Sequence, residues 1–241
     1  MESGRSISVN AVVEFNDVSF SYGDADVLQG VSFSLAKGDK ISIIGSNGAG
    51  KSTTLKISTG LLRPKSGIVN VLGTSPEKRE IKRKLGYLPE DASPYRLLSV
   101  QENIQYSALL RGVEDIVEST ERVIDLFDLS HLRLSKAYTL SRGNAQRLAL
   151  AMVFVHNPEV LILDEPLNYL DMNMQESVVK LVRKTEATVL VSTHVVSTAS
   201  RLTDRIMILS SGMIKWIGTM DEIKTDTDSG ETIEARLGRM M

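Results

Sequence analysis

The chain has 241 residues, of which 42% are hydrophobic and 24% are charged, a composition typical of globular and not of disordered proteins. Its formal net charge of −2 gives no overall cationic field, so we expect no nucleic-acid partner. It contains no cysteine, which excludes disulfides and thiolate metal sites. The longest apolar runs, such as Val160–Leu163, are too short to cross a bilayer, so a role at a membrane needs a separate anchor.

The N-terminal part of the chain is rich in short apolar segments that predict strands. Val12–Tyr22 predicts a pair of strands, which we interpret as an N-terminal antiparallel β portion. Lys40–Ile44 predicts a strand that enters a glycine-rich loop, and a helix is expected over Ser52–Gly60. The other strands expected in this part lie around Ile68–Val71 and Leu85–Leu88.

The middle of the chain changes character. Between Ser99 and Asn157 apolar residues recur at helical spacing and strand signals disappear, which predicts a helical subdomain at about residues 91–157. Alternation of strands and helices then resumes and predicts a mostly parallel sheet flanked by helices. The elements expected there are strands Val160–Leu163, Thr188–Val191 and Arg205–Leu209, with a helix over Asn173–Lys184 and another after Val191.

Between the predicted strand Lys40–Ile44 and the helix that follows it, Gly45–Ser52 matches the pattern G-x-x-x-x-G-K-[ST]. Glycines let backbone N–H groups wrap an anionic phosphate closely, and the following helix N-terminus adds a favourable dipole. The alternative, a plain glycine turn, is disfavoured because the match lies between a strand and a helix. We expect ATP to bind through Gly45, Ser46, Asn47, Gly48, Ala49, Gly50, Lys51, Ser52 and Thr53.

A second pattern places two carboxylates, Asp164 and Glu165, at the carboxyl end of an apolar strand. We expect Asp164 to bind Mg²⁺ together with the hydroxyl of Ser52, and Glu165 to polarise the attacking water. Lys51 is expected to contact the β- and γ-phosphates. The alternative for the acidic pair is a surface turn before Pro166.

These motifs predict an α/β fold: a phosphate-loop NTPase core, a mostly parallel sheet flanked by helices, with an inserted α-helical subdomain. We expect one domain over residues 1–241, with its core at about 10–90 and 158–224. Residues 225–241 have the composition of a linker followed by a short C-terminal tail.

Leu140-Ser-Arg-Gly-Asn144, before a predicted helix, is similar to the LSGGQ signature of the ATP-binding cassette (ABC) family. With the motifs above, the chain resembles the nucleotide-binding domain of that family from about Val12 to Lys224, most closely the export-type and ABC-2 cassettes. The resemblance implies a head-to-tail dimer in which the signature of one subunit contacts ATP held by the other. The signature residues are Ser141, Arg142, Gly143 and Asn144.

The resemblance implies four further roles. Tyr22 matches the aromatic residue that stacks on adenine, and the alternative is a strand tyrosine packed on the core. Glu90 stands in the Q-loop, where it would contact the metal, Asp171 lies in the D-loop, and His194 matches the switch histidine, which would contact the γ-phosphate.

The chain departs from the family pattern at several of these positions. Glu90 replaces a glutamine in the Q-loop. In the signature, Arg142 replaces glycine and Asn144 replaces glutamine. Leu167-Asn-Tyr169 replaces a small Thr-Ser-Gly segment before Asp171, and the bulk of Tyr169 bears on the dimer contact. These changes are expected to affect the rate of ATP hydrolysis and its coupling to transport, but not nucleotide binding.

The function expected from the resemblance is that of an ATP-hydrolysing subunit of an ABC transporter that exports its cargo. Its cofactors would be ATP and Mg²⁺, and its partners a second cassette, identical or not, and transmembrane permease subunits. It would then be cytoplasmic and peripheral on the inner face of the membrane. Two alternatives stay open: a soluble ABC ATPase that acts on ribosomes or DNA, and a regulatory cassette that hydrolyses ATP weakly.

Overall fold

A computed structural model of the chain describes residues 11–225. Its N-terminal part forms a three-stranded antiparallel sheet in the order β2-β1-β4. The strands of this sheet are β1 (Ala11–Tyr22), β2 (Ala25–Ala36) and β4 (Ser66–Val71). The prediction of an antiparallel portion is confirmed.

The prediction that Val12–Tyr22 holds two strands is wrong, because Ala11–Tyr22 is a single strand. The polar pair Asn16-Asp17, which reads as a turn, lies at an irregularity in the register between Phe15 and Val18. Asp17 has a φ of 51°, which distorts the strand locally but does not reverse the direction of the chain. The reversal follows Tyr22 instead, and the strand after it was missed.

The second sheet has six strands in the order β5-β6-β7-β3-β8-β9. All neighbours are parallel except β9, which pairs antiparallel with β8. This confirms the mostly parallel sheet, while β9 was not predicted. The strands are β3 (Lys40–Ile44), β5 (Leu85–Leu88), β6 (Val160–Asp164), β7 (Thr188–Thr193), β8 (Arg205–Ser210) and β9 (Met213–Thr219).

Both faces of the six-stranded sheet are packed against other elements. Alternate residues of a strand point to opposite faces, so each strand contributes side chains to two cores. In β6, Val160 and Ile162 join a core with α1 (Lys51–Ser58) and the antiparallel sheet, whereas Leu161 and Leu163 join a core with α5 (Arg142–Phe154) and α6 (Met172–Lys184). The α-helices that lie outside the expected helical subdomain are α1 (Lys51–Ser58), α2 (Arg79–Lys84), α6 (Met172–Lys184), α7 (Val196–Leu202) and α8 (Met220–Thr225).

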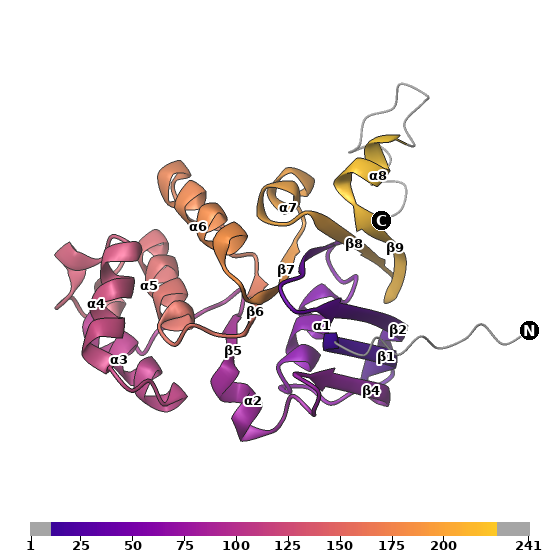
Figure 1. Cartoon of the computed structure of the whole chain (residues 1–241), viewed down its shortest axis with the longest axis horizontal. Helices are drawn as coiled ribbons and strands as arrows, with labels where there is room; N and C mark the ends of the chain where they lie inside the picture. The colour runs from indigo at the N-terminus through magenta and orange to yellow at the C-terminus, as the bar shows by residue number, and fades with distance from the viewer. Residues whose placement is uncertain (1–10, 226–241) are drawn as a thin grey trace, which may run out of the picture.

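Between β5 and β6 the chain forms a helical lobe, as the apolar spacing predicts. Its helices are α3 (Val100–Arg111), α4 (Ile116–Leu126) and α5 (Arg142–Phe154). Buried residues such as Ile104, Val123 and Leu150 join them in one core. Figure 1 shows the lobe at one end of the molecule and the antiparallel sheet at the other. The domain boundaries drawn from the sequence stay a proposal.

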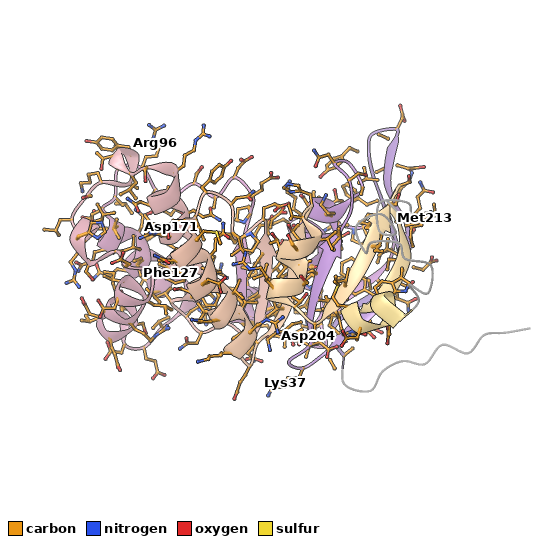
Figure 2. The ribbon with its side chains drawn as sticks, turned by 90° about the horizontal axis from the view of Figure 1, so that it is seen from above. Lys37, Arg96, Phe127, Asp171, Asp204 and Met213 are labelled. Carbon is orange, nitrogen blue, oxygen red and sulfur yellow. The ribbon has the colours of Figure 1, made fainter. Side chains whose placement is uncertain are left out.

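The segments that precede the parallel strands and those that follow them lie on opposite sides of the molecule. Figure 2 places Lys37 and Asp204, which precede β3 and β8, at one side, and Arg96, which follows β5, at the other. Within residues 11–225 no helix has both the length and the apolar character needed to cross a membrane. The expected linker and tail fall outside the described residues, apart from Thr225, which ends α8.

Candidate nucleotide-binding site

The glycine-rich loop connects the end of β3 to the start of α1, and its glycines are required by the backbone. Gly48 and Gly50 have φ values of 82° and 104°, which residues with a side chain rarely adopt. A Cβ on Gly45 would lie 2.2 Å from the carbonyl oxygen of Leu209. Around Gly48, in contrast, nothing lies within 4 Å of such a Cβ. The loop is therefore packed on its inner side and open at Gly48.

Lys51 begins α1 and returns its side chain to the loop. Its Nζ donates to the carbonyl oxygens of Gly45, at 2.8 Å, and Ser46, at 2.9 Å. Burial lowers the pKa of this ammonium, and the charges of Glu165, Asp164 and Glu90 oppose that shift. A cation that contacts only carbonyl oxygens at the mouth of an open loop is suited to meet an anion.

Asp164 is the last residue of β6 and is 3% exposed. Because β6 and β7 are parallel and Asp164 lies opposite Ser192, the hydroxyl of Ser192 donates to Asp164 Oδ1. Glu165 follows with a φ of 48°, and its backbone N–H donates to the carbonyl oxygen of Ser192. The end of the neighbouring strand thus fixes the orientation of both acidic residues.

The carboxylate of Glu165 accepts three hydrogen bonds from the end of β7. Thr193 Oγ1 lies 3.1 Å from Oε2, while the backbone N of His194 lies 2.9 Å from Oε1. The ring Nδ1 of His194 is 2.6 Å from the same Oε1. The side chain of His194 is 56% exposed. Two of the three residues expected to take part in catalysis, Glu165 and His194, are therefore in direct contact, and the third is Lys51.

A cavity of about 600 Å³ unites most of the predicted residues. Tyr22 reaches it from β1, half exposed, with its ring edge-on to Phe20 at 4.8 Å. Glu90 reaches it from the segment after β5. The lining consists of Tyr22, Val27, Asn47, Gly48, Gly50, Lys51, Ser52, Thr53, Glu90, Asp164, Glu165 and His194.

The remaining residues of the predicted loop, Gly45, Ser46 and Ala49, do not line the cavity. Ser46 accepts the ammonium of Lys51 and the backbone N–H of Ala49 through its carbonyl oxygen. Ala49 is buried, and its own carbonyl accepts the N–H of Gly212, between β8 and β9. These residues fix the loop against the sheet.

The chemistry of the lining fits a polyphosphate with Mg²⁺. An ammonium, an open glycine loop and a helix N-terminus are suited to phosphate, while Ser52, Glu90 and Asp164 offer the oxygen donors that Mg²⁺ prefers. Within residues 11–225 no group of three or more His, Cys, Asp or Glu side chains could hold a metal ion. Mg²⁺ takes one or two carboxylates and completes its shell with phosphate oxygens and water.

The predicted signature residues do not line this cavity. Ser141 caps α5, because its Oγ accepts the N–H of Asn144 at 3.3 Å, and Arg142 and Gly143 form the first turn with Asn144. A Cβ on Gly143 would lie 2.8 Å from the carbonyl oxygen of Tyr169, which explains the need for glycine there. The start of α5 therefore packs closely against the loop after β6.

Asp171 lies at the start of α6, outside the cavity. Its Oδ1 accepts the N–H of Met174 at 3.0 Å, and its Oδ2 accepts from Arg147 of α5. Arg147 also contacts Asp128 at 3.2 Å. This ion-pair network joins α5 to the beginning of α6.

Sequence reasoning missed three residues of the site: Val27, Ser192 and Thr193. Val27 lies on the unpredicted strand β2 and lines the cavity. The two hydroxyl residues orient Asp164 and Glu165. Their signal was the change from apolar to polar residues at the end of β7, which marks the functional edge of a parallel sheet.

Comparison with known sequences gives a consistent result. The uncharacterized ABC transporter ATP-binding protein YxlF of Bacillus subtilis is 35% identical over 212 residues, which cover 85% of this chain and 70% of that protein. The linearmycin resistance ATP-binding protein LnrL of Bacillus subtilis is 31% identical over 92% of this chain and 73% of its own length. The bacitracin transport ATP-binding protein BcrA of Bacillus licheniformis is 29% identical over 86% of this chain and 69% of its own length.

Solved structures agree with these relatives. One described as the ATP-binding subunit of an ABC transporter matches with a TM-score of 0.87 at 29% identity, over 95% of this chain and 99% of that one. The dimeric cassette MJ0796, in a post-hydrolysis state with ADP and Pi, matches with a TM-score of 0.79 at 25% identity, over 86% and 98%. The sequence model of the family described as ABC transporter matches residues 28–168, more than half of the chain. The chain therefore belongs to the ABC transporter family.

Proposed function

We propose that this chain is the ATP-hydrolysing subunit of an ABC transporter that drives export through separate membrane subunits. The observation that carries the proposal is the cavity in which a phosphate loop, two acidic residues and a histidine meet. The names of the relatives LnrL and BcrA, for linearmycin resistance and bacitracin transport, support a role in export.

In this proposal the phosphate loop binds the triphosphate of ATP through its backbone N–H groups and Lys51, and Tyr22 stacks on adenine. Ser52, Asp164 and Glu90 would hold Mg²⁺, which when bound supplies positive charge to the phosphate oxygens. The hydroxyl of Ser192 keeps Asp164 in a fixed orientation. Lys51 exchanges its two carbonyl contacts for phosphate oxygens, so its burial no longer leaves an ammonium without an anion.

Glu165 acts as the general base for the attacking water. Its carboxylate is held by Thr193 and by the backbone and ring of His194, so it is oriented before substrate arrives. The ring nitrogen of His194 that does not face Glu165 is free to contact the γ-phosphate. Hydrolysis then depends on positioning and on stabilisation of charge at the phosphates.

The second half of the site comes from another cassette. The start of α5, with Ser141 and Gly143, offers a hydroxyl and free backbone N–H groups, yet it lies outside the cavity of its own chain. A head-to-tail dimer would bring it to the ATP of the partner. The neighbour MJ0796 is dimeric with ADP and Pi bound, which supports the formation of a dimer.

The membrane partner would bind beside Glu90. A cavity of about 190 Å³ lies there between the segment after β5 and helices α3 and α5, lined by residues such as Tyr87, Pro89 and Met152. Large apolar side chains of α3, Leu109 and Leu110, are exposed nearby in the chain, as is common at protein interfaces. A permease that docks in this position would sense the metal site and hold the chain at the inner face of the membrane.

The test is the variant Glu165→Gln of the purified chain. We expect Mg²⁺-dependent ATP hydrolysis to fall by about 100-fold or more, because a general base contributes 10²–10⁴ to the rate. ATP binding should persist, and ATP should hold the variant as a dimer in size-exclusion chromatography with light scattering. Glu80→Gln, which changes an exposed glutamate of α2, serves as the matched control.

Hydrolysis by Glu165→Gln at the parental rate would overturn the assignment of the base. A parent chain that binds ATP but scarcely hydrolyses it, with or without its permease, would favour the regulatory cassette. The relatives named for transport and resistance give no support to an action on ribosomes or DNA.

A further inference from the structure

Two residues that depart from the family pattern contact each other in the structure. The guanidinium carbon of Arg142 lies 5.7 Å from the centre of the Tyr169 ring, over its face. This is within the range of a cation–π interaction. Arg142 is the first residue of α5, whereas Tyr169 belongs to the loop between β6 and α6. The two replacements of small residues thus form one structural unit.

Arg142 has no acidic partner in the part of the chain that the structure describes. Arg147, on the same helix, contacts both Asp128 and Asp171. The first turn of α5 contains no acidic residue, and a cation at the positive end of a helix dipole is unfavourable. An anion from outside the chain would relieve this accumulation of positive charge.

Tyr169 is suited to hold the guanidinium in position. Its backbone has a φ of 65°, which is uncommon for a residue with a bulky side chain. Its carbonyl oxygen lies 2.8 Å from the position that a Cβ on Gly143 would take. The loop thus packs closely against the first turn of α5, while Tyr169 itself is 59% exposed and its ring contacts the guanidinium of Arg142. The stacked guanidinium keeps its N–H donors available.

We propose that Tyr169 positions Arg142 as an additional ligand for the terminal phosphate of ATP held by a second copy of this chain. Arginine presents a planar set of donors that binds phosphate oxygens in pairs. It would act beside the hydroxyl of Ser141 and the N–H of Gly143. The inference rests on the proposed function, because it requires the head-to-tail dimer.

The experiment measures ATP-dependent dimerisation by sedimentation velocity, with all chains carrying Glu165→Gln so that ATP persists. We expect Arg142→Ala to raise the dimer dissociation constant about 100-fold, because each of the two ATP sites of the dimer loses a charge-assisted hydrogen bond that contributes about 10-fold. Tyr169→Ala should raise it about 3-fold, and Tyr169→Phe, which keeps the ring, should restore the parental value. ATP affinity of the monomer should not change in any of them.

Two comparisons separate positioning from a merely structural role. If Tyr169 acts through Arg142, adding Tyr169→Ala to Arg142→Ala causes no further loss. Arg79→Ala is the matched control, because Arg79 is also the exposed first residue of a helix and has no ion pair within residues 11–225.

The outcomes distinguish this inference from the proposed function. Parental dimerisation of Arg142→Ala, or losses that add fully in the double variant, would overturn the inference and leave the dimer intact. A Glu165→Gln chain that binds ATP but stays monomeric would overturn the dimer, and this inference with it.

Discussion

Helices α3 and α5 of the lobe both begin after a serine that caps the first turn, yet the two first turns differ in charge. At α3, Ser99 Oγ accepts the N–H of Glu102 at 3.2 Å, and Glu102 in return accepts the N–H of Ser99 at 2.6 Å. At α5, Ser141 caps the N–H of Asn144, but no acidic residue returns the contact. Instead, Arg142 adds a positive charge.

This difference indicates what each helix start is for. A reciprocal capping box satisfies the free N–H groups of α3 within the chain, as stability favours. The start of α5 leaves donors and positive charge exposed, a less stable arrangement that is suited to an external phosphate. Substitutions that change one helix start at a time test this difference.

The largest effect is expected for Gly143→Ala. The added Cβ would lie 2.8 Å from the carbonyl oxygen of Tyr169, so the start of α5 or the facing loop must move. We expect ATP hydrolysis to fall about 100-fold, as for loss of one well-placed donor to a transition state. Nucleotide affinity of the monomer should stay unchanged in equilibrium binding.

Gly112→Ala, at the end of α3, is the control for the loss of a glycine. Nothing lies within 4 Å of a Cβ there, so the substitution displaces no neighbouring atom and should leave hydrolysis intact. It should reduce the stability of the fold, because the φ of 76° at this position is unfavourable for alanine. Equal loss of hydrolysis in both variants would refute a specific role for the start of α5.

A smaller effect is expected for Asn144→Glu, which gives α5 the Ser-x-x-Glu pattern of α3. The new carboxylate would complete a capping box and stabilise the fold by about 0.5–1 kcal/mol in urea unfolding. It would also repel phosphate, so ATP-dependent dimerisation should weaken about 10-fold. A variant with stronger dimerisation would contradict the assignment of the α5 start to phosphate. The reciprocal change, Glu102→Asn in α3, should lower stability without affecting dimerisation.

The smallest effect concerns the pH dependence of stability at α3. The hydrogen bond from the backbone of Ser99 and the contact with Lys136 lower the pKa of Glu102 from 4.5 to about 2. Because the pKa is lowered in the folded state, the stabilisation is present above pH 4.5 and is lost as pH falls toward 2. Glu102→Gln should therefore lose less stability than the parent between pH 5 and about pH 3 in urea titrations. Identical curves would show that the capping box carries no such linkage.

The parts of the fold that were predicted are those that depend on local pattern. Lys40–Ile44, the glycine loop and the helix after it are contiguous, so one motif identifies all three. β9 was missed because its turn, Ser211-Gly212, with φ values of 48° and 73°, gives only a short signal beside the strong apolar strand β8. β2 was missed because Asn16-Asp17 attracted the predicted turn to the wrong side of the strand.

The site was predicted as far as strand ends determine it. The segments that follow β3, β6 and β7 meet at one edge of the sheet, which brings Lys51, Glu165 and His194 together. The contact between Arg142 and Tyr169 was beyond prediction, because it depends on how closely Gly143 lets α5 approach a distant loop. The pattern identified both residues as departures, and only the packing pairs them.

In the proposed dimer, each ATP site combines the phosphate loop of one chain with the α5 start of another. This is tested by ATP hydrolysis in an equimolar mixture of two variants, Lys51→Ala and Gly143→Ala, each inactive alone. A mixed dimer contains one site with both halves intact, so we expect mixing to restore hydrolysis. A mixture as inactive as its components, under conditions in which the parent chain hydrolyses ATP, would contradict it.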